Sequence, residues 1–160
     1  MKIYNFVISA ALLAALTACS PVTSKEESAK TESKTTVAKP VVKAPVAKDG
    51  KVINLEDASA IAPGVKVDQL TVIDFNAIWC GPCRQLTPVV DELAEKYKGR
   101  VTFISVDVDR FSDLFRSYNL GSSIPAVVFL LPDGTQRRYI GTSELLPASA
   151  FEALIEQNLQ

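Results

Sequence analysis

Cys80 and Cys83 lie where two segments with different hydrophobic patterns meet, and this junction constrains the fold most. Residues 70–75 before it form an apolar, β-branched run that is typical of a buried central strand. After it, apolar residues recur at helical spacing, at Leu86, Val89, Val90, Leu93, Ala94 and Tyr97. A buried strand that leads directly into an amphipathic helix predicts an α/β domain.

The rest of the chain from residue 51 continues this alternation of strand and helix patterns. The further predicted strands are residues 52–55, 101–108, 126–131 and 135–140, and the further predicted helices are residues 111–118 and a segment after Pro147. Pro132-Asp133-Gly134 is a turn signal between the last two strands. This order predicts a mixed sheet, with a parallel crossover part and a hairpin at its end.

Composition limits the reactive chemistry to cysteine. The 160 residues carry a formal net charge of -1 and include no histidine. A nearly neutral chain has no electrostatic signature for nucleic acid, and without histidine neither Ser–His–Asp nor Cys–His catalysis is available. The 3 cysteines are a lone Cys19 and the pair Cys80 and Cys83. Because a structural zinc site normally needs four ligands, we expect no metal and no cofactor.

The cysteine pair has the spacing for two-step thiol–disulfide exchange. A cysteine at a helix N-terminus faces unpaired backbone N–H groups and the positive end of the helix dipole, which favour its thiolate. Cys80 is therefore the predicted nucleophile, and Cys83, about one helical turn later, is the predicted resolving residue. Gly81 keeps the approach to the sulfur open, and Pro82 suits a first helical turn.

The motif W-C-G-P-C after V-I-D-F-N-A-I resembles thioredoxin, and the likeness covers nearly all of residues 51–160. The resemblance implies a thioredoxin-like α/β fold, with a central mixed β-sheet flanked by helices on both faces. It also implies that Asp74, six residues before the first cysteine, is buried below the pair and assists proton transfer involving Cys83. Burial would then raise the pKa of Asp74. The alternative is an ordinary polar residue at a strand end.

The resemblance also implies a substrate groove beside the cysteines. Pro125 matches the family's cis-proline loop, in which Ile124 would offer backbone groups to an extended substrate. Gly141 resembles a family glycine near this groove. The other residues expected on the surface around the nucleophile are Trp79, Gly81 and Pro82.

Three positions depart from the thioredoxin pattern. Asn76 stands where typical thioredoxins carry a tryptophan, and Ser105 stands where they carry a lysine near the buried aspartate. Ala126 replaces the threonine that usually follows the cis-proline. We therefore expect Asp74 to lack its usual cationic neighbour and the surface to recognise different partners.

The N-terminus has the pattern of a bacterial lipoprotein signal. Lys2 precedes an uncharged, mostly apolar run over residues 3–18, which is shorter than the roughly 20 residues of a membrane-spanning helix. Leu16-Thr17-Ala18-Cys19 resembles the lipobox, which implies a signal peptide over residues 1–18 and lipid on Cys19. Ser20 in the next position resembles outer-membrane sorting. An ordinary signal peptide and an uncleaved anchor are the alternatives.

Residues 19–50 are rich in serine, threonine, lysine, glutamate, alanine and proline and contain no aromatic residue. Such a segment cannot bury enough apolar surface to offset its conformational entropy. We therefore expect a lipidated cysteine and a flexible tether, followed by one thioredoxin-like domain at residues 51–160. The expected location is the bacterial cell envelope, with a monomeric domain in the periplasm.

These features favour an exported, membrane-tethered protein-disulfide reductase. The Gly–Pro dipeptide between the cysteines resembles reducing thioredoxins rather than the C-P-H-C of strong periplasmic oxidants. Its partners would be disulfide-containing envelope proteins and, as electron donor, a transmembrane thiol reductase. Two other interpretations stay open: a disulfide oxidase or isomerase, and a non-catalytic binding module with a structural disulfide.

Overall fold

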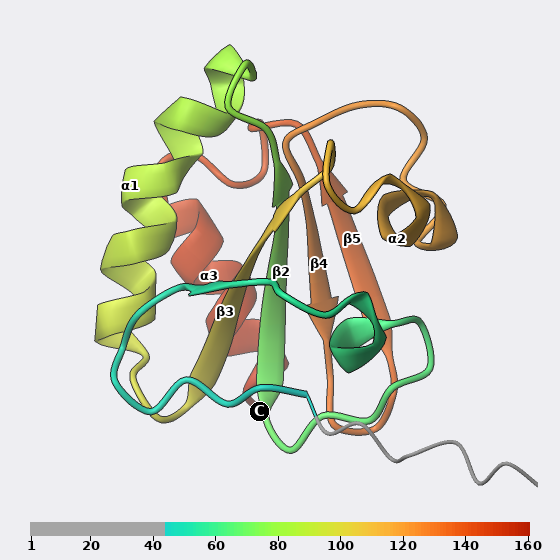
Figure 1. The fold of residues 1–160 in the computed structure, drawn as a ribbon. Helices are drawn as coiled ribbons and strands as arrows, with labels where there is room; N and C mark the ends of the chain where they lie inside the picture. Colours follow the sequence, from blue (N-terminus) through green and yellow to red (C-terminus); the bar gives the residue numbers. More distant parts are fainter. Residues whose placement is uncertain (1–43) are drawn as a thin grey trace, which may run out of the picture. The chain divides into compact units, whose positions relative to one another are not determined.

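The computed structural model describes residues 44–160, and Figure 1 shows the arrangement of their helices and strands. The strands are β1 (Ile53–Asn54), β2 (Leu70–Asn76), β3 (Val101–Asp107), β4 (Ala126–Leu130) and β5 (Gln136–Ile140). The helices are the 3₁₀-helix η1 (Ala58–Ile61), α1 (Gly81–Lys96), α2 (Ser112–Ser117) and α3 (Ala148–Asn158). The expected signal peptide, Cys19 and the tether up to residue 43 lie outside the described residues. Within residues 44–160, no helix is both long enough and apolar enough to cross a membrane.

The strands form one mixed sheet in the order β1-β3-β2-β4-β5. β2 lies at its centre, parallel to β3 and antiparallel to β4. β1 pairs in parallel with β3, and the β4–β5 hairpin forms the other edge. Because parallel neighbours need a crossover connection, α1 links β2 to β3. The predicted mixed sheet with a terminal hairpin is confirmed.

Alternate residues of the central strand supply two cores, one on each face of the sheet. Val72 packs in the core that contains Leu86 of α1 and Phe151 of α3. Its neighbour Ile73 packs in the core that contains Leu114 of α2. Successive strand residues point to opposite faces, and Figure 1 shows α1 and α3 on one side of the sheet and α2 on the other. The predicted α/β layering, with helices on both faces, is therefore confirmed.

α1 begins at the cysteine pair because the local sequence supplies a helix start. Cys80 is the N-cap residue with extended backbone, and Pro82 lies in the first turn, where a missing N–H costs nothing. Leu86 and Val90 are buried on the face toward the sheet. Pro88 lies inside the helix, where it removes one backbone hydrogen bond. The packed apolar face holds the start of α1, and with it both cysteines, at the end of β2.

The segment before β1 packs against the domain, although its composition resembles that of the tether. Ala44 and Ala47 are buried, and Ala44 joins the core that contains Ile61. Gly50 has a φ of 76°, and a Cβ there would lie 2.4 Å from Glu95 Oε2. This close approach in a left-handed conformation favours glycine. The packed part of the chain therefore starts before residue 51.

Candidate active site

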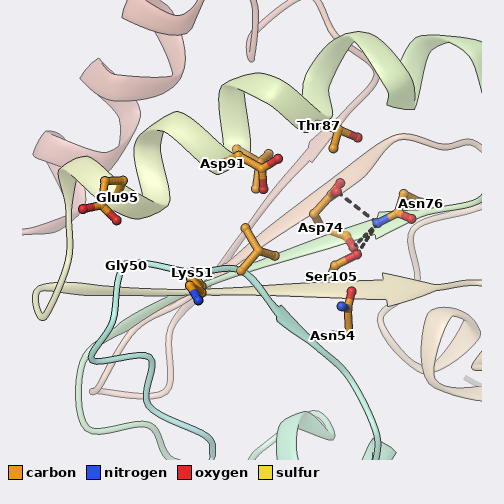
Figure 2. A pocket seen from close by; sticks show the side chains of 11 residues that line it. Gly50, Lys51, Asn54, Asp74, Asn76, Thr87, Asp91, Glu95 and Ser105 are labelled. Atoms are coloured by element: carbon orange, nitrogen blue, oxygen red, sulfur yellow. Dashed lines mark hydrogen bonds between the residues drawn. The ribbon is translucent and has the colours of Figure 1, made fainter.

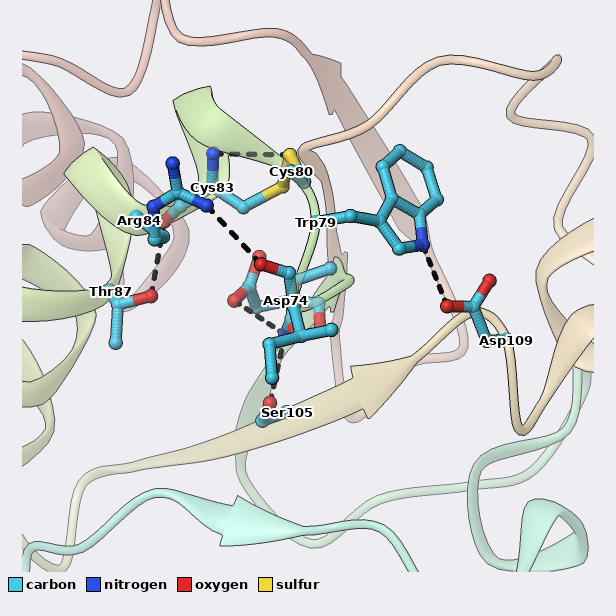
Figure 3. Close-up of a disulfide and its surroundings, with 10 residues drawn as sticks. Asp74, Trp79, Cys80, Cys83, Arg84, Thr87, Ser105 and Asp109 are labelled. Atoms are coloured by element: carbon cyan, nitrogen blue, oxygen red, sulfur yellow. Dashed lines mark hydrogen bonds between the residues drawn. A yellow bond between two sulfur atoms is a disulfide. The ribbon is translucent and has the colours of Figure 1, made fainter.

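Cys80 and Cys83 are joined by a disulfide at the N-terminus of α1 (Figure 3). The two residues are only 4% and 3% exposed. They pack with Ala77, and the partly buried Val108 and Ile124 lie against this cluster. Only a small part of the disulfide is therefore open to an attacking thiol.

The sulfur of Cys80 lies at the positive end of α1. Its Sγ accepts a hydrogen bond from the backbone N–H of Cys83 at 3.2 Å, as the N-cap side chain of the helix. The same N–H group and the helix dipole stabilise negative charge on this sulfur once the disulfide is reduced. The helix start therefore favours the thiolate form of Cys80.

Asp74 lies in β2, and Figure 3 shows its side chain on the sheet side of the disulfide. It is only 5% exposed and lies in register with Ser105 on β3 and Val127 on β4. Burial raises the pKa of Asp74 from 3.8 to about 6, and a hydrogen bond from Asn76 opposes this rise. A carboxyl group with such a pKa exchanges a proton close to neutral pH.

Asn76 supplies the side-chain contact to this carboxylate. Its Nδ2 donates to Asp74 Oδ2 at 3.0 Å, to the Asp74 carbonyl oxygen at 3.2 Å and to Ser105 Oγ at 2.8 Å. Asp74 Oδ1 is buried and has no hydrogen-bond partner among the described residues. Asn76 and Ser105, which appear in the sequence only as separate departures from the family pattern, thus form one network around the carboxylate. The register of β2 against β3, which local sequence patterns do not contain, brings them together.

An exposed apolar surface adjoins the disulfide. Ile78 is 88% exposed and Trp79 is 63% exposed. The indole Nε1 of Trp79 donates to Asp109 Oδ2 at 2.7 Å (Figure 3). Arg84 Nη1 donates to the carbonyl oxygen of Ile78 at 3.3 Å. Asp109 and Arg84, which the sequence analysis did not select, therefore help to fix the shape of this surface.

Gly81 and Pro82 form the first turn of α1 between the two cysteines. A Cβ at Gly81 would meet only Arg84 Nη2, at 3.8 Å. Proline has no backbone N–H, and neither residue carries a polar side chain. Gly81 and Pro82 therefore place no polar side chain next to the sulfur atoms.

The loop before β4 lies beside the cysteine pair. The Ile124–Pro125 peptide bond is cis, and Ile124 packs against the disulfide cluster. The backbone N–H of Gly141 donates to the carbonyl oxygen of Pro125 at 2.8 Å. Gly141 has a φ of 84°, a backbone conformation that favours glycine. Ile124 therefore lies next to the disulfide, and the adjacent Pro125 is joined to Gly141 by a backbone hydrogen bond.

Two open clefts border the network around Asp74. The larger, of about 490 Å³, is lined by Asp74, Asn76 and Ser105 together with Lys51, Asn54, Thr87, Asp91 and Glu95 (Figure 2). The second, of about 410 Å³, shares Asn76 and Ser105 with the first and extends to Cys83. In the part of the chain that the structure describes, no three histidine, cysteine, aspartate or glutamate side chains are grouped as a metal site.

A disulfide at the start of the helix that follows the central strand of such a mixed sheet is characteristic of thiol–disulfide oxidoreductases, and this chain is one. It belongs to the thioredoxin family, whose profile matches residues 53–156.

Individual relatives support this assignment. The chain is 35% identical over 89 residues to a thioredoxin of Borreliella burgdorferi, a match that covers 56% of this chain and 73% of the relative. It is 31% identical over 108 residues to thioredoxin C-2 of Corynebacterium nephridii, with 68% and 96% covered. The solved structure of Malassezia sympodialis thioredoxin superposes with a TM-score of 0.60 and 26% identity, covering 72% of this chain and 97% of that one. The predicted thioredoxin-like fold and enzyme class are therefore confirmed.

Proposed function

We propose that this thioredoxin-family chain is an exported, membrane-tethered protein-disulfide reductase of the bacterial cell envelope. The observation that carries the proposal is the place of Cys80 Sγ, which accepts the N–H of Cys83 at the helix N-terminus. A thiolate favoured at this sulfur is the species that attacks disulfides. The exposed Ile78 and Trp79 beside it offer an apolar surface to a partner protein.

The reaction proceeds in two exchange steps. The Cys80 thiolate attacks one sulfur of the substrate disulfide, forms a mixed disulfide and releases the other substrate sulfur as a thiolate. Cys83 then gives its proton to Asp74, and its thiolate attacks Cys80 Sγ. The Cys80–Cys83 disulfide forms and the second substrate sulfur leaves as a thiolate. Both substrate thiolates take up protons, one of them from Asp74, so the substrate gains two electrons and the enzyme loses two.

The cis-proline loop would bind the substrate backbone. Ile124 packs against the cysteine cluster, so an extended chain that pairs with its backbone lies within reach of Cys80. The hydrogen bond from Gly141 to Pro125 holds this loop in place. The surface on the other side of the bound chain would come from Trp79, Gly81 and Pro82.

The membrane tether is supported by the N-terminal sequence, in which the lipobox-like segment ends at Cys19 and Ser20 follows. In Figure 1 the described chain enters the domain at the end of the sheet opposite the β2–α1 turn. A tether that joins at this end would be attached at the opposite end of the sheet from the cysteines. Electrons for a reductase in this place would come from a transmembrane thiol reductase.

Trapping of the mixed disulfide tests the roles of the two cysteines. Cys83→Ser removes the resolving thiol, so we expect it to accumulate covalent adducts with envelope proteins that dithiothreitol releases. Cys80→Ser is the matched control and should form none, because it lacks the attacking sulfur. If Cys83→Ser traps nothing and Cys80→Ser reduces insulin at the wild-type rate, these roles are wrong.

The equilibrium reduction potential of the pair tests the direction of electron flow. A value near roughly −270 mV, as in thioredoxin, would support a reductase. A value near roughly −120 mV, at the oxidising end of the range, would instead make the protein a disulfide-forming enzyme.

Cell fractionation tests the tether. Cys19→Ser removes the proposed lipid attachment site, so the variant should leave the membrane fraction for the soluble one. If this variant still sediments with membranes as the wild-type protein does, a lipid anchor on Cys19 is excluded.

A further inference from the structure

We propose that Asn76 is a positioning residue for the exchange reaction: held by Ser105, its amide binds Oδ2 of Asp74 and leaves Oδ1 to accept the Cys83 proton. This inference rests on the proposed role of Asp74 in proton transfer. It concerns a residue pair that replaces the tryptophan and lysine of typical thioredoxins.

The amide of Asn76 has only one favourable orientation beside an ionised Asp74. A carboxylate carries acceptor atoms only, so the NH₂ group of the amide must face it. Nδ2 contacts Ser105 Oγ at 2.8 Å on β3, and on β2 it contacts Asp74 Oδ2 at 3.0 Å and the Asp74 carbonyl oxygen at 3.2 Å. Acceptors on two paired strands therefore fix the position of this donor.

The two carboxylate oxygens of Asp74 are consequently different. Oδ2 accepts from Asn76, whereas Oδ1 is buried without a partner among the described residues. A proton on Oδ2 would weaken the hydrogen bond that this oxygen accepts, whereas a proton on Oδ1 leaves that bond intact. The proton therefore binds at Oδ1.

Other ionisable groups also border this site, and they come from three directions. They are Lys51 from the segment before β1, Asp107 and Arg110 from the end of β3 and the loop after it, and, from α1, Arg84, Asp91, Glu95 and, after reduction, Cys83. The register neighbours of Asp74 on β3 and β4 are the uncharged Ser105 and Val127. Within residues 44–160, the one side-chain hydrogen bond to the Asp74 carboxylate comes from Asn76, so this amide is the group that distinguishes the two oxygens.

The test combines two measurements on purified protein: the pH profile of insulin reduction, and the pKa of Asp74 by NMR of its carboxyl carbon. Asn76→Ala removes a hydrogen bond to the charged form, so the pKa of Asp74 should rise by about one unit. The acidic limb of the rate profile should move with it, which lowers the rate about tenfold at pH values below that pKa. Ser105→Ala keeps the amide of Asn76 but removes its hydrogen bond to β3. This variant should shift the pKa of Asp74 and the acidic limb in the same direction as Asn76→Ala, but by less.

Asn54→Ala is the matched control, because Asn54 lines the same cleft without bonding Asp74; it should keep the wild-type profile. The proposal is overturned if Asn76→Ala and Ser105→Ala keep the wild-type pKa and limb while Asp74→Asn abolishes the limb. In that result the proposed role of Asp74 stands. If Asp74→Asn also keeps the wild-type limb, the role of Asp74 fails and the inference about Asn76 fails with it.

Discussion

Replacing Asp74 by asparagine removes a buried titratable group from β2 while keeping its size. The pKa of this carboxyl group is ordinarily 3.8 and is raised to about 6 by burial in the folded protein. Between these values the folded state binds more protons than the unfolded state, so the free energy of unfolding falls as the pH rises. The stabilising contribution is complete below the unfolded pKa and is lost as the pH passes the folded one. A gap of about two pKa units, at about 1.36 kcal/mol each, corresponds to about 3 kcal/mol.

Urea denaturation of the oxidised wild type and of Asp74→Asn, from about pH 4 to about pH 8, measures this contribution. Across that range the variant should gain roughly 2 to 3 kcal/mol in free energy of unfolding relative to the wild type. Asp91→Asn is the matched control, because Asp91 lies exposed on α1 at the same cleft, and it should follow the wild type. If the free energy of unfolding changes equally with pH in the wild type and in Asp74→Asn, burial does not raise the pKa of Asp74.

Three further substitutions test the partner surface, the core and a contact between helices. Ile78 is 88% exposed, so Ile78→Ser should change the free energy of unfolding by less than about 0.5 kcal/mol. The same variant should have a higher KM for a protein disulfide and an unchanged rate with a small disulfide. Phe129 is fully buried and stacks on Phe151, so Phe129→Ala should lose about 3–5 kcal/mol in urea denaturation. Tyr97 donates to Glu156 at 2.7 Å, so Tyr97→Phe should lose about 1 kcal/mol in the same assay.

Elements with a strong hydrophobic pattern agree between the sequence and the structure. The strand expected at residues 70–75 is β2, and the strand expected at residues 126–131 is β4. All five residues of β4 are buried, because this strand is covered on both faces, and such burial requires the unbroken apolar run that the sequence contains. The amphipathic pattern of α1 also predicted this helix and its buried face, because an apolar helix face packs against a core in any fold.

Features that depend on distant partners were less predictable. β1 spans Ile53–Asn54, compared with an expected strand at residues 52–55, because pairing with β3 limits its extent. Ala44 and Ala47 belong to a segment whose composition resembles a tether, yet their small side chains pack against the domain. The bond between Asn76 and Ser105 joins residues 29 positions apart. It exists only because the sheet sets the register of their two strands.

The neutral amide of Asn76 has a different electrostatic consequence from the lysine that typical thioredoxins carry near the buried aspartate. A nearby cation favours the carboxylate through charge–charge attraction, which lowers the pKa and is weakened by salt where the charges reach solvent. The contact between Asn76 and Asp74 is instead a short-range hydrogen bond at 3.0 Å to a buried group, which dissolved ions screen far less. Burial and this single amide therefore hold the pKa of Asp74 at about 6. If the domain works outside the cytoplasm, as proposed, the ionic strength around it follows the surrounding medium. This arrangement would then keep proton transfer from Cys83 to Asp74 largely independent of salt.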